Sequence, residues 1–292
     1  MPLETEKYMR LAIDEACLSL REGNHGFGAV IVDKGNVVAV AHDLEETDHD
    51  PTAHAELLAI RKAAAMLGKD LSSCSLYSTH EPCPMCATAI VWAQITHIGY
   101  GYGIRDAIKQ GRRRVDLSCI ELFSRAGAEI QVEDGLCKAD CVILYDQDVR
   151  AEVRRLRRAT DEQLIAYNLE TTEKRVQWFN SAGGRGVSSG TDLVRNGYEL
   201  LLKKLGIIET EAPIFQKTEN QIVFHSINKC PTLEACKILQ LDTRRVCRLS
   251  NEGATNSLLR QFDQRLSFSR NYERLRPYSE YCEEIISLRD DT

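Results

Sequence analysis

Hydrophobic residues recur at helical spacing over residues 3–22, and the pattern stops at Gly23. Residues 28–41 hold two apolar runs around a short polar turn, which predicts a β-hairpin. Three further apolar stretches predict strands, at 75–79, 95–101 and 129–132. With helices between the strands, the order αββαβαβ predicts an α/β sandwich with helices on both faces of a central sheet.

Two of the expected helices begin beside prolines. Asp50 is expected to cap the first helix, with Pro51 in its first turn, where no amide donor is needed. The second helix is expected to begin at Pro82 and to run on past Ile90. Trp92 follows this apolar segment, so we expect it in the core.

The pattern changes after residue 147, where polar helices replace the strands. Residues 148–190 are predicted to form a helical connector that ends in a Gly/Ser-rich loop at 181–190. Residues 191–292 combine predicted helices, a hairpin and a final strand, which indicates a second α+β domain of uncertain role. The expected organisation is therefore 1–147, 148–190 and 191–292.

Composition indicates a globular chain. Of its 292 residues 43% are hydrophobic and 27% are charged. No apolar run is long enough to span a bilayer, and no signal-peptide pattern is visible, so we expect a cytoplasmic location and no membrane contact. Residues 1–150 hold 23 acidic against 15 basic residues. Because nucleic-acid binders carry a basic footprint, this acidity argues against a nucleic-acid substrate and favours a small molecule.

The chemistry is concentrated in residues 54–56, His-Ala-Glu, and 81–86, Glu-Pro-Cys-Pro-Met-Cys. His54, Cys83 and Cys86 would supply three ligands to Zn²⁺, which leaves the fourth tetrahedral position to water. Zinc deaminases carry this H-x-E and P-C-x-x-C signature, in which the glutamate moves protons and is not a ligand. We therefore predict Zn²⁺ as cofactor and Glu56 as the catalytic acid and base.

A zinc ion that only stabilises the fold is the alternative. Such a site would need four cysteine or histidine ligands. The nearest spare candidates, His80 and His97, are not suitably spaced. The number of cysteines, eleven, is odd, so we expect reduced thiols away from the zinc site rather than a disulfide framework.

Residues 1–145 resemble the zinc-dependent cytidine/deoxycytidylate deaminase superfamily, within it the guanine deaminase and tRNA adenosine deaminase branch. The segments that carry this resemblance are 26–32, 50–56 and 81–90. Cys-Pro-Met-Cys at 83–86 and Trp92 look closest to guanine deaminases. The resemblance implies a three-layer, cytidine-deaminase-like sandwich around a mixed five-stranded sheet, one zinc per chain and a homodimer.

The resemblance also implies substrate contacts. The family's base-reading asparagine falls on Asp43, which can only accept hydrogen bonds when ionised and would favour N–H donors or a cationic substrate. A solvated acid at a strand end is the alternative. Phe27 would stack on a planar ring, or pack in the core, and the backbone carbonyl of Glu81 would accept from the leaving amine. Ala55 completes the predicted substrate-binding set.

One departure from guanine deaminases lies after Gly103. The segment that completes the guanine pocket in guanine deaminases is not visible, and a basic run, Arg112-Arg113-Arg114, follows instead. This run would hold an anionic substrate or a nucleic acid, or it would be a solvated helix end.

The C-terminal domain resembles L-2-amino-thiazoline-4-carboxylate hydrolase-like domains only faintly, through short cysteine-containing segments. On that resemblance Cys230 would be the first residue to test for chemistry, and a structural thiol at a helix start is the alternative.

The leading hypothesis is a zinc-dependent hydrolytic deaminase that releases ammonia from a small amino-substituted heterocycle. The expected substrate is a guanine-like free base or a related amino-purine, pyrimidine or triazine. One alternative is a tRNA adenosine deaminase. Another is a deaminase fused to a small-ligand-binding or hydrolase-like regulatory domain.

Overall fold

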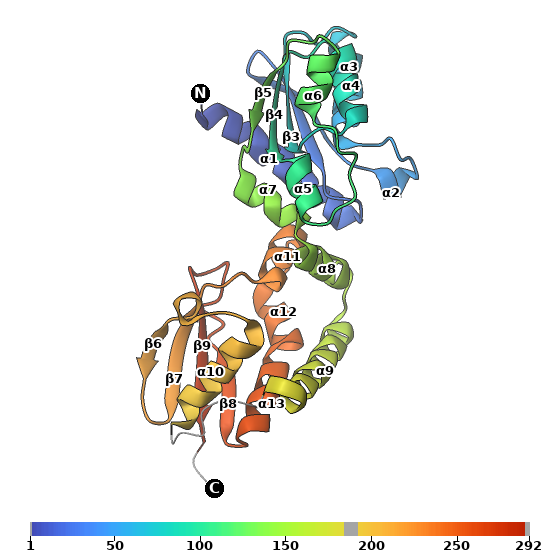
Figure 1. The fold of residues 1–292 in the computed structure, drawn as a ribbon. Helices are drawn as coiled ribbons and strands as arrows, with labels where there is room; N and C mark the ends of the chain where they lie inside the picture. Colours follow the sequence, from blue (N-terminus) through green and yellow to red (C-terminus); the bar gives the residue numbers. More distant parts are fainter. Residues whose placement is uncertain (1, 184–191, 290–292) are drawn as a thin grey trace. The chain divides into compact units, whose positions relative to one another are not determined.

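The computed structural model describes residues 2–183 and 192–289, and it divides into two compact units, 1–154 and 155–292. Each unit has its own sheet and its own helices (Figure 1). Residues 184–190 of the predicted Gly/Ser-rich loop lie outside the described residues. Within the described ranges no helix is both long enough and apolar enough to cross a membrane.

The first unit contains a mixed five-stranded sheet in the order β2-β1-β3-β4-β5, which confirms the predicted fold class. Strand β1 is antiparallel to β2 and β3, whereas β3, β4 and β5 are parallel. The elements are α1 Pro2–Glu22, β1 Gly28–Asp33, β2 Asn36–His42, α2 Glu45–Asp48, α3 Ala55–Leu67, β3 Cys74–His80, α4 Pro84–Trp92, β4 His97–Tyr102, α5 Ile104–Lys109, α6 Cys119–Arg125, β5 Gln131–Asp134, α7 Lys138–Tyr145 and α8 Gln147–Leu156.

Helices cover both faces of this sheet, so the unit has three layers (Figure 1). Helices α1 and α7 pack on one face, while α3 and α4 lie on the other face beside α6. In α3, Ala55, Ala59 and Ala63 recur every four residues and are fully buried, so this helix lies close to the strands. On the opposite face a Cβ at Gly28 would lie 2.0 Å from the Ala12 carbonyl oxygen, so only glycine allows α1 to pack directly on β1.

Three local predictions in this unit were wrong. Helix α4 begins at Pro84 rather than at Pro82, because Cys83 before it has an extended backbone. Helix α3 begins at Ala55 rather than at Pro51, because Asp50 accepts hydrogen bonds from the backbone and hydroxyl of Thr52 and so forms a turn. Trp92 is 81% exposed rather than buried, because α4 turns Ile90 toward the core and ends at Trp92.

The second unit contains an antiparallel four-stranded sheet in the order β6-β7-β9-β8, with helices packed against it. This is the expected α+β domain. Helix α9, predicted as part of a connector, packs against α12 and α13 of this unit. The elements are α9 Asp161–Trp178, a π-helical turn Phe179–Gly183, α10 Leu193–Leu205, a 3₁₀ turn Glu209–Glu211, β6 Ile214–Lys217, β7 Gln221–Ser226, α11 Pro231–Leu239, α12 Thr243–Ser250, α13 Glu252–Phe262, β8 Leu266–Arg270 and β9 Cys282–Leu288.

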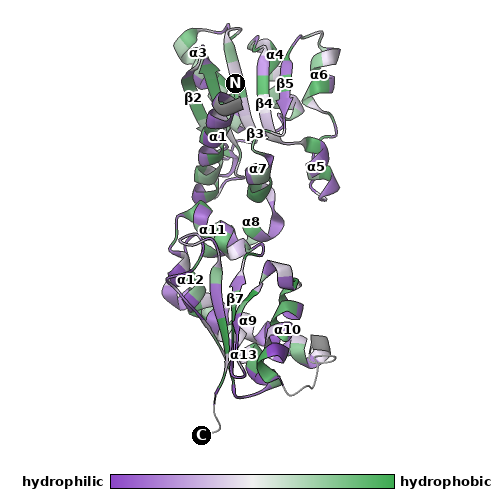
Figure 2. Cartoon of the chain, turned by 90° about the vertical axis from the view of Figure 1, so that its left-hand side faces the viewer, coloured by the Kyte–Doolittle hydropathy of each residue, from purple (hydrophilic) through white to green (hydrophobic). Residues whose placement is uncertain are grey.

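The distribution of hydrophobic residues on these helices explains why they pack against the sheets. In Figure 2, α6 and α10 each carry both hydrophobic and hydrophilic residues. In α10, Val194, Tyr198 and Leu201 recur at helical spacing and are buried in the core of the second unit. The polar residues of such a helix remain in water while its apolar face covers the sheet.

Candidate metal site and active cavity

Three possible metal ligands meet at the N-terminal ends of two helices. His54 directly precedes α3, Cys83 directly precedes α4, and Cys86 lies in the first turn of α4. Their ligand atoms all lie within 4.8 Å of one another. The pKa of Cys83 is lowered to about 4, chiefly by its hydrogen bond with Cys86 and also by His54, whereas the same hydrogen bond and burial raise the pKa of Cys86, so the pair favours a thiolate at Cys83.

The spacing of the three ligand atoms fits a zinc ion. His54 Nδ1 lies 3.5 Å from Cys83 Sγ and 3.4 Å from Cys86 Sγ, and the two sulfur atoms are 3.6 Å apart. Bond lengths of about 2.3 Å to sulfur and about 2.1 Å to nitrogen, arranged as a tetrahedron, place such ligand atoms about 3.6–3.8 Å apart. The three side chains that the sequence predicted as ligands therefore lie together at a possible metal site, and they could hold a zinc ion.

Glu56 lies beside these ligands and reaches the same cavity. His54 has an extended backbone and stands outside α3, whereas Glu56 is in its first turn, so both side chains extend past the helix start. The Glu56 side chain is buried, and the Ser78 hydroxyl donates a hydrogen bond of 3.0 Å to its Oε1. Burial raises the pKa of Glu56 above its ordinary value.

Glu45 contacts His54 on the side of the ring that faces away from the sulfur atoms. This contact was not predicted from the sequence. Oε1 of Glu45 lies 3.1 Å from Nε2 of His54, the ring nitrogen opposite the one that faces the sulfur atoms. A histidine that binds metal commonly donates its other N–H to a carboxylate, which fixes the ring and raises its basicity. The acidic stretch around Glu45 was the only sequence signal, and it resembled an ordinary solvated surface.

Replacing Glu45 by glutamine should weaken zinc binding roughly 10- to 100-fold, because the amide is a poorer acceptor for the His54 N–H. Zinc affinity is measured by competition with a chromogenic chelator. The matched control is Glu46→Gln, because Glu46 is an exposed acid of the same helix that contacts His25 instead. Equal zinc affinity for the two variants would contradict a supporting role for Glu45.

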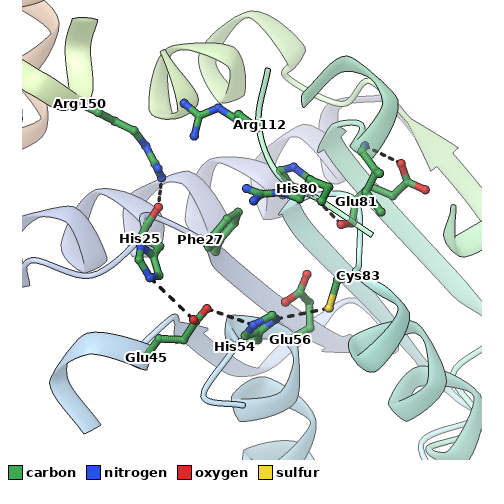
Figure 3. A pocket seen from close by; sticks show the side chains of 12 residues that line it. His25, Phe27, Glu45, His54, Glu56, His80, Glu81, Cys83, Arg112 and Arg150 are labelled. Atoms are coloured by element: carbon green, nitrogen blue, oxygen red, sulfur yellow. Dashed lines mark hydrogen bonds and ion pairs between the residues drawn. The ribbon is translucent and has the colours of Figure 1, made fainter. Parts of the chain in front are cut away.

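A cavity of about 320 Å³ opens above the metal site (Figure 3). Such a volume suits a small ligand. Its walls are formed by His25, Phe27, Glu45, His54, Glu56, His80, Glu81, Cys83, Ile104, Arg112, Arg114 and Arg150.

The predicted substrate-binding residues separate into two groups. Phe27 and Glu81 line the cavity, whereas Asp43 and Ala55 are not among the lining residues. The Glu81 carbonyl accepts from His80 Nδ1 at 2.9 Å, and its carboxylate accepts from the backbone amides of α5 and α6. Glu81 therefore also fixes the loops that close this side of the cavity.

Asp43 is fully buried, so the alternative of a solvated acid was wrong. Its Oδ1 accepts a hydrogen bond of 2.7 Å from the backbone N–H of His25, and Ser19 donates to the same oxygen. Its Oδ2 has no hydrogen-bond partner within the described residues. Asp43 thus holds His25, a lining residue, in position.

His80 lies in the cavity wall and not among the metal ligands. Its ring packs edge-on against Phe27, Tyr102 and Tyr145. Burial lowers the pKa of His80 to about 4, so the ring is neutral near pH 7. The other spare histidine, His97, interacts with Glu133 at 3.0 Å.

Arginines from two separate segments reach the cavity. Arg112 and Arg114 of the predicted basic run line it, whereas Arg113 between them is exposed. Arg150 of α8 joins them from 36 residues further along the chain, and nothing local in the sequence indicated this.

In the second unit Cys230 directly precedes α11. Burial raises the pKa of the Cys230 thiol, which disfavours the nucleophilic thiolate form. Its predicted reactivity has no support from this environment.

The segment that contains the possible metal site matches a known protein family. Residues 3–102 match the family model described as the cytidine and deoxycytidylate deaminase zinc-binding region. A guanine deaminase of Bacillus subtilis (strain 168) is 44% identical over 108 residues, which are 36% of this chain and 69% of that protein. A tRNA-specific adenosine deaminase of the same organism is 42% identical over 99 residues, 34% of this chain and 62% of that protein.

A solved structure from a study of A-to-I editing by tRNA:A34 deaminases is also similar. It shows 32% identity, with a TM-score of 0.42, over 47% of this chain and 98% of that chain. All three matches leave more than half of the present chain uncovered.

Proposed function

Because the chain belongs to the cytidine and deoxycytidylate deaminase family, whose zinc-binding region spans residues 3–102, we propose that it hydrolytically deaminates a small amino-substituted heterocycle. The observation that carries this proposal is the convergence of His54, Cys83 and Cys86 with the buried carboxylate of Glu56 at one end of a cavity of about 320 Å³. The ring would be guanine-like in size, or a related amino-purine, pyrimidine or triazine.

The reaction replaces an amino group on the ring by oxygen, with water as the other reactant and ammonia as the product. His54, Cys83 and Cys86 would hold the zinc ion, which when bound supplies the Lewis acidity that activates water near neutral pH. Glu56 takes a proton from the attacking water and delivers it to a ring nitrogen. The same carboxyl then takes the second proton, from the hydroxyl now on the ring carbon, and passes it to the amino group, so a C=O bond forms as the C–N bond breaks and ammonia leaves.

The chain's other residues hold the ring and the catalytic carboxylate. Ser78 fixes Oε1 of Glu56 through its hydroxyl, which aims the carboxylate into the cavity. Phe27 offers an aromatic face in the cavity wall on which a planar ring can stack. The carbonyl of Glu81 keeps a second lone pair for the amine, because His80 uses only one.

A tRNA substrate is the second candidate, since several relatives are tRNA-specific adenosine deaminases. The acidic balance of residues 1–150 favours the small molecule. The deciding experiment is an ammonia-release screen over free bases, nucleosides, pterins and triazines, run beside an RNA stem-loop. Release from small heterocycles supports the proposal, whereas turnover of RNA alone would overturn it.

We also propose a homodimer formed through the outer helices of the first unit. Met66 of α3, Trp92 of α4 and Ile120 of α6 are large apolar residues that are 69%, 81% and 53% exposed. Helix α3 packs against α4, and α4 packs against α6, and exposed apolar side chains on neighbouring helices are typical of interaction sites.

Replacing Trp92 by glutamate should weaken the dimer by about thirtyfold or more, as expected for a buried aromatic interface residue. Light scattering coupled to size-exclusion chromatography measures the mass of each variant across a dilution series. Leu169→Glu, at an apolar residue of α9 that is 64% exposed, should leave the dimer intact. A Trp92→Glu protein with wild-type mass at every dilution would contradict this interface.

We propose that the protein works in a reducing compartment, the cytoplasm, because all eleven cysteines are free thiols.

For the second unit, a small-ligand-binding or hydrolase-like role stays a prediction. Ammonia release by a chain that stops after residue 154, beside that of the full chain, would show whether residues 155–292 regulate the first unit.

A further inference from the structure

Three arginines converge at the end of the cavity away from the metal site. Figure 3 shows Arg112 and Arg150 on the far side of Phe27 from His54, Glu56 and Cys83. Arg114 lines the same cavity. One end of the cavity therefore holds the possible metal ligands and Glu56, and the other end carries three positive charges.

Aromatic rings and backbone carbonyls hold these arginines in place. The guanidinium carbons of Arg112 and Arg150 lie 6.0 Å and 5.5 Å from the centre of the Tyr145 ring. The guanidinium carbon of Arg114 lies 5.6 Å from the Phe27 ring centre. Arg150 also donates to the carbonyls of Leu144 and His25. The side chains are thus positioned before any ligand arrives, which lowers the entropic cost of binding.

No acidic side chain of the described residues lies within ion-pair distance of the three guanidinium groups. Among residues 2–183 and 192–289, none of the three arginines forms an ion pair within 4.0 Å. Nε and Nη2 of Arg112 are buried and have no hydrogen-bond partner in the described part of the chain. Such buried donors are costly unless something binds them.

The carboxylates that line the same cavity are already engaged elsewhere. Glu45 contacts His54, and Glu56 accepts from Ser78. Both carboxylate oxygens of Glu81 accept backbone N–H groups, from Ile104 and Cys119. Within the described residues, no carboxylate of the cavity wall is therefore left to pair with the three arginines, and Asp146 acts on Arg112 only from beyond ion-pair distance.

We propose that Arg112, Arg114 and Arg150 bind an anionic oxygen group of the substrate, a carboxylate or a phosphate monoester. This inference rests on the proposed deaminase function and narrows it, because a neutral base such as guanine lacks the group. Guanidinium groups match carboxylate and phosphate oxygens with paired N–H donors. The ring would then lie beside Phe27, with its amino-bearing carbon toward His54 and Cys83.

The first test compares rings with and without the anionic group. For the ring that gives the greatest ammonia release, kcat/KM is measured for the neutral form, its carboxylate and its phosphate monoester. Arg112→Gln and Arg114→Gln should each lower kcat/KM about 10- to 100-fold for the preferred anionic form, and less than twofold for the neutral form. The matched control is Arg113→Gln, because Arg113 is exposed and does not line the cavity. It should change neither value.

The second test needs no turnover and uses inorganic phosphate as the probe. Phosphate should raise the Tm of the wild type, of Arg113→Gln and of Glu56→Gln, because a ligand stabilises the folded state that binds it. Arg112→Gln and Arg114→Gln should need at least about tenfold more phosphate for the same shift. Such a result without ammonia release from any small heterocycle would sink the proposed function but support the anion site.

Equal phosphate responses in all variants, together with equal kcat/KM for neutral and anionic rings, would overturn the arginine assignment and leave the deaminase proposal intact. Turnover of an RNA stem-loop that depends on Arg112, with no turnover of any small anionic ring, would overturn it as well. In that case the arginines would bind the phosphates of a polynucleotide.

Discussion

Replacing Glu56 by glutamine should lower kcat for ammonia release by roughly 10²- to 10⁴-fold, while the protein keeps one zinc ion per chain. Glutamine has the shape of glutamate, and it can still bind Ser78, but it cannot carry protons from water to the ring nitrogen and the amine. Steady-state ammonia release and metal analysis of the same preparation give the two values.

The matched control for Glu56→Gln is Asp48→Asn, which removes an exposed carboxylate from α2. The control should retain wild-type kcat. If Glu56→Gln turned over substrate at the wild-type rate with its zinc in place, proton transfer would have to be assigned to another group, and the mechanism proposed above would be wrong.

The second large effect is expected from Cys86→Ala. Loss of one of three protein ligands should leave the purified protein without zinc, and ammonia release should fall roughly a thousandfold or more. Cys86 is fully buried, and alanine removes little volume, so the fold should remain. Metal content by mass spectrometry, activity and circular dichroism are measured together.

Cys74→Ala is the control for the cysteine substitution. Cys74 is equally buried, but it lies at the start of β3, away from the metal ligands. This variant should bind zinc as the wild type does. Full zinc occupancy in Cys86→Ala would show that the P-C-x-x-C segment does not hold the metal.

The local parts of this account could be predicted from the sequence. His54, Cys83 and Cys86 were recognised because metal ligands need particular side chains at short, fixed spacings. The α/β sandwich was predicted because apolar runs alternate with helical patterns along the first half of the chain, and the family resemblance implied its mixed five-stranded sheet. Asp50 misled the prediction because an aspartate before a proline can either cap a helix or close a turn, and only the folded chain decides between them.

The contacts that give the cavity its character could not be predicted. Glu45 precedes His54 by nine residues and looked like one more acid in an acidic stretch. Arg150 and Arg112 line the same cavity although they are far apart in the sequence. Tertiary packing brings α8 to this cavity, and no local sequence pattern indicates that contact. Trp92 followed two apolar residues, but the end of α4 leaves it exposed. Each error concerns a relation set by tertiary packing rather than by local spacing.

The most direct test of the central claim, zinc-dependent hydrolytic deamination, is ammonia release by the wild-type protein before zinc removal, after removal by a chelator and after zinc is restored. Zinc content and ammonia release should fall together, and both should return when one equivalent of zinc per chain is added. Undiminished ammonia release from protein stripped of zinc would contradict the claim.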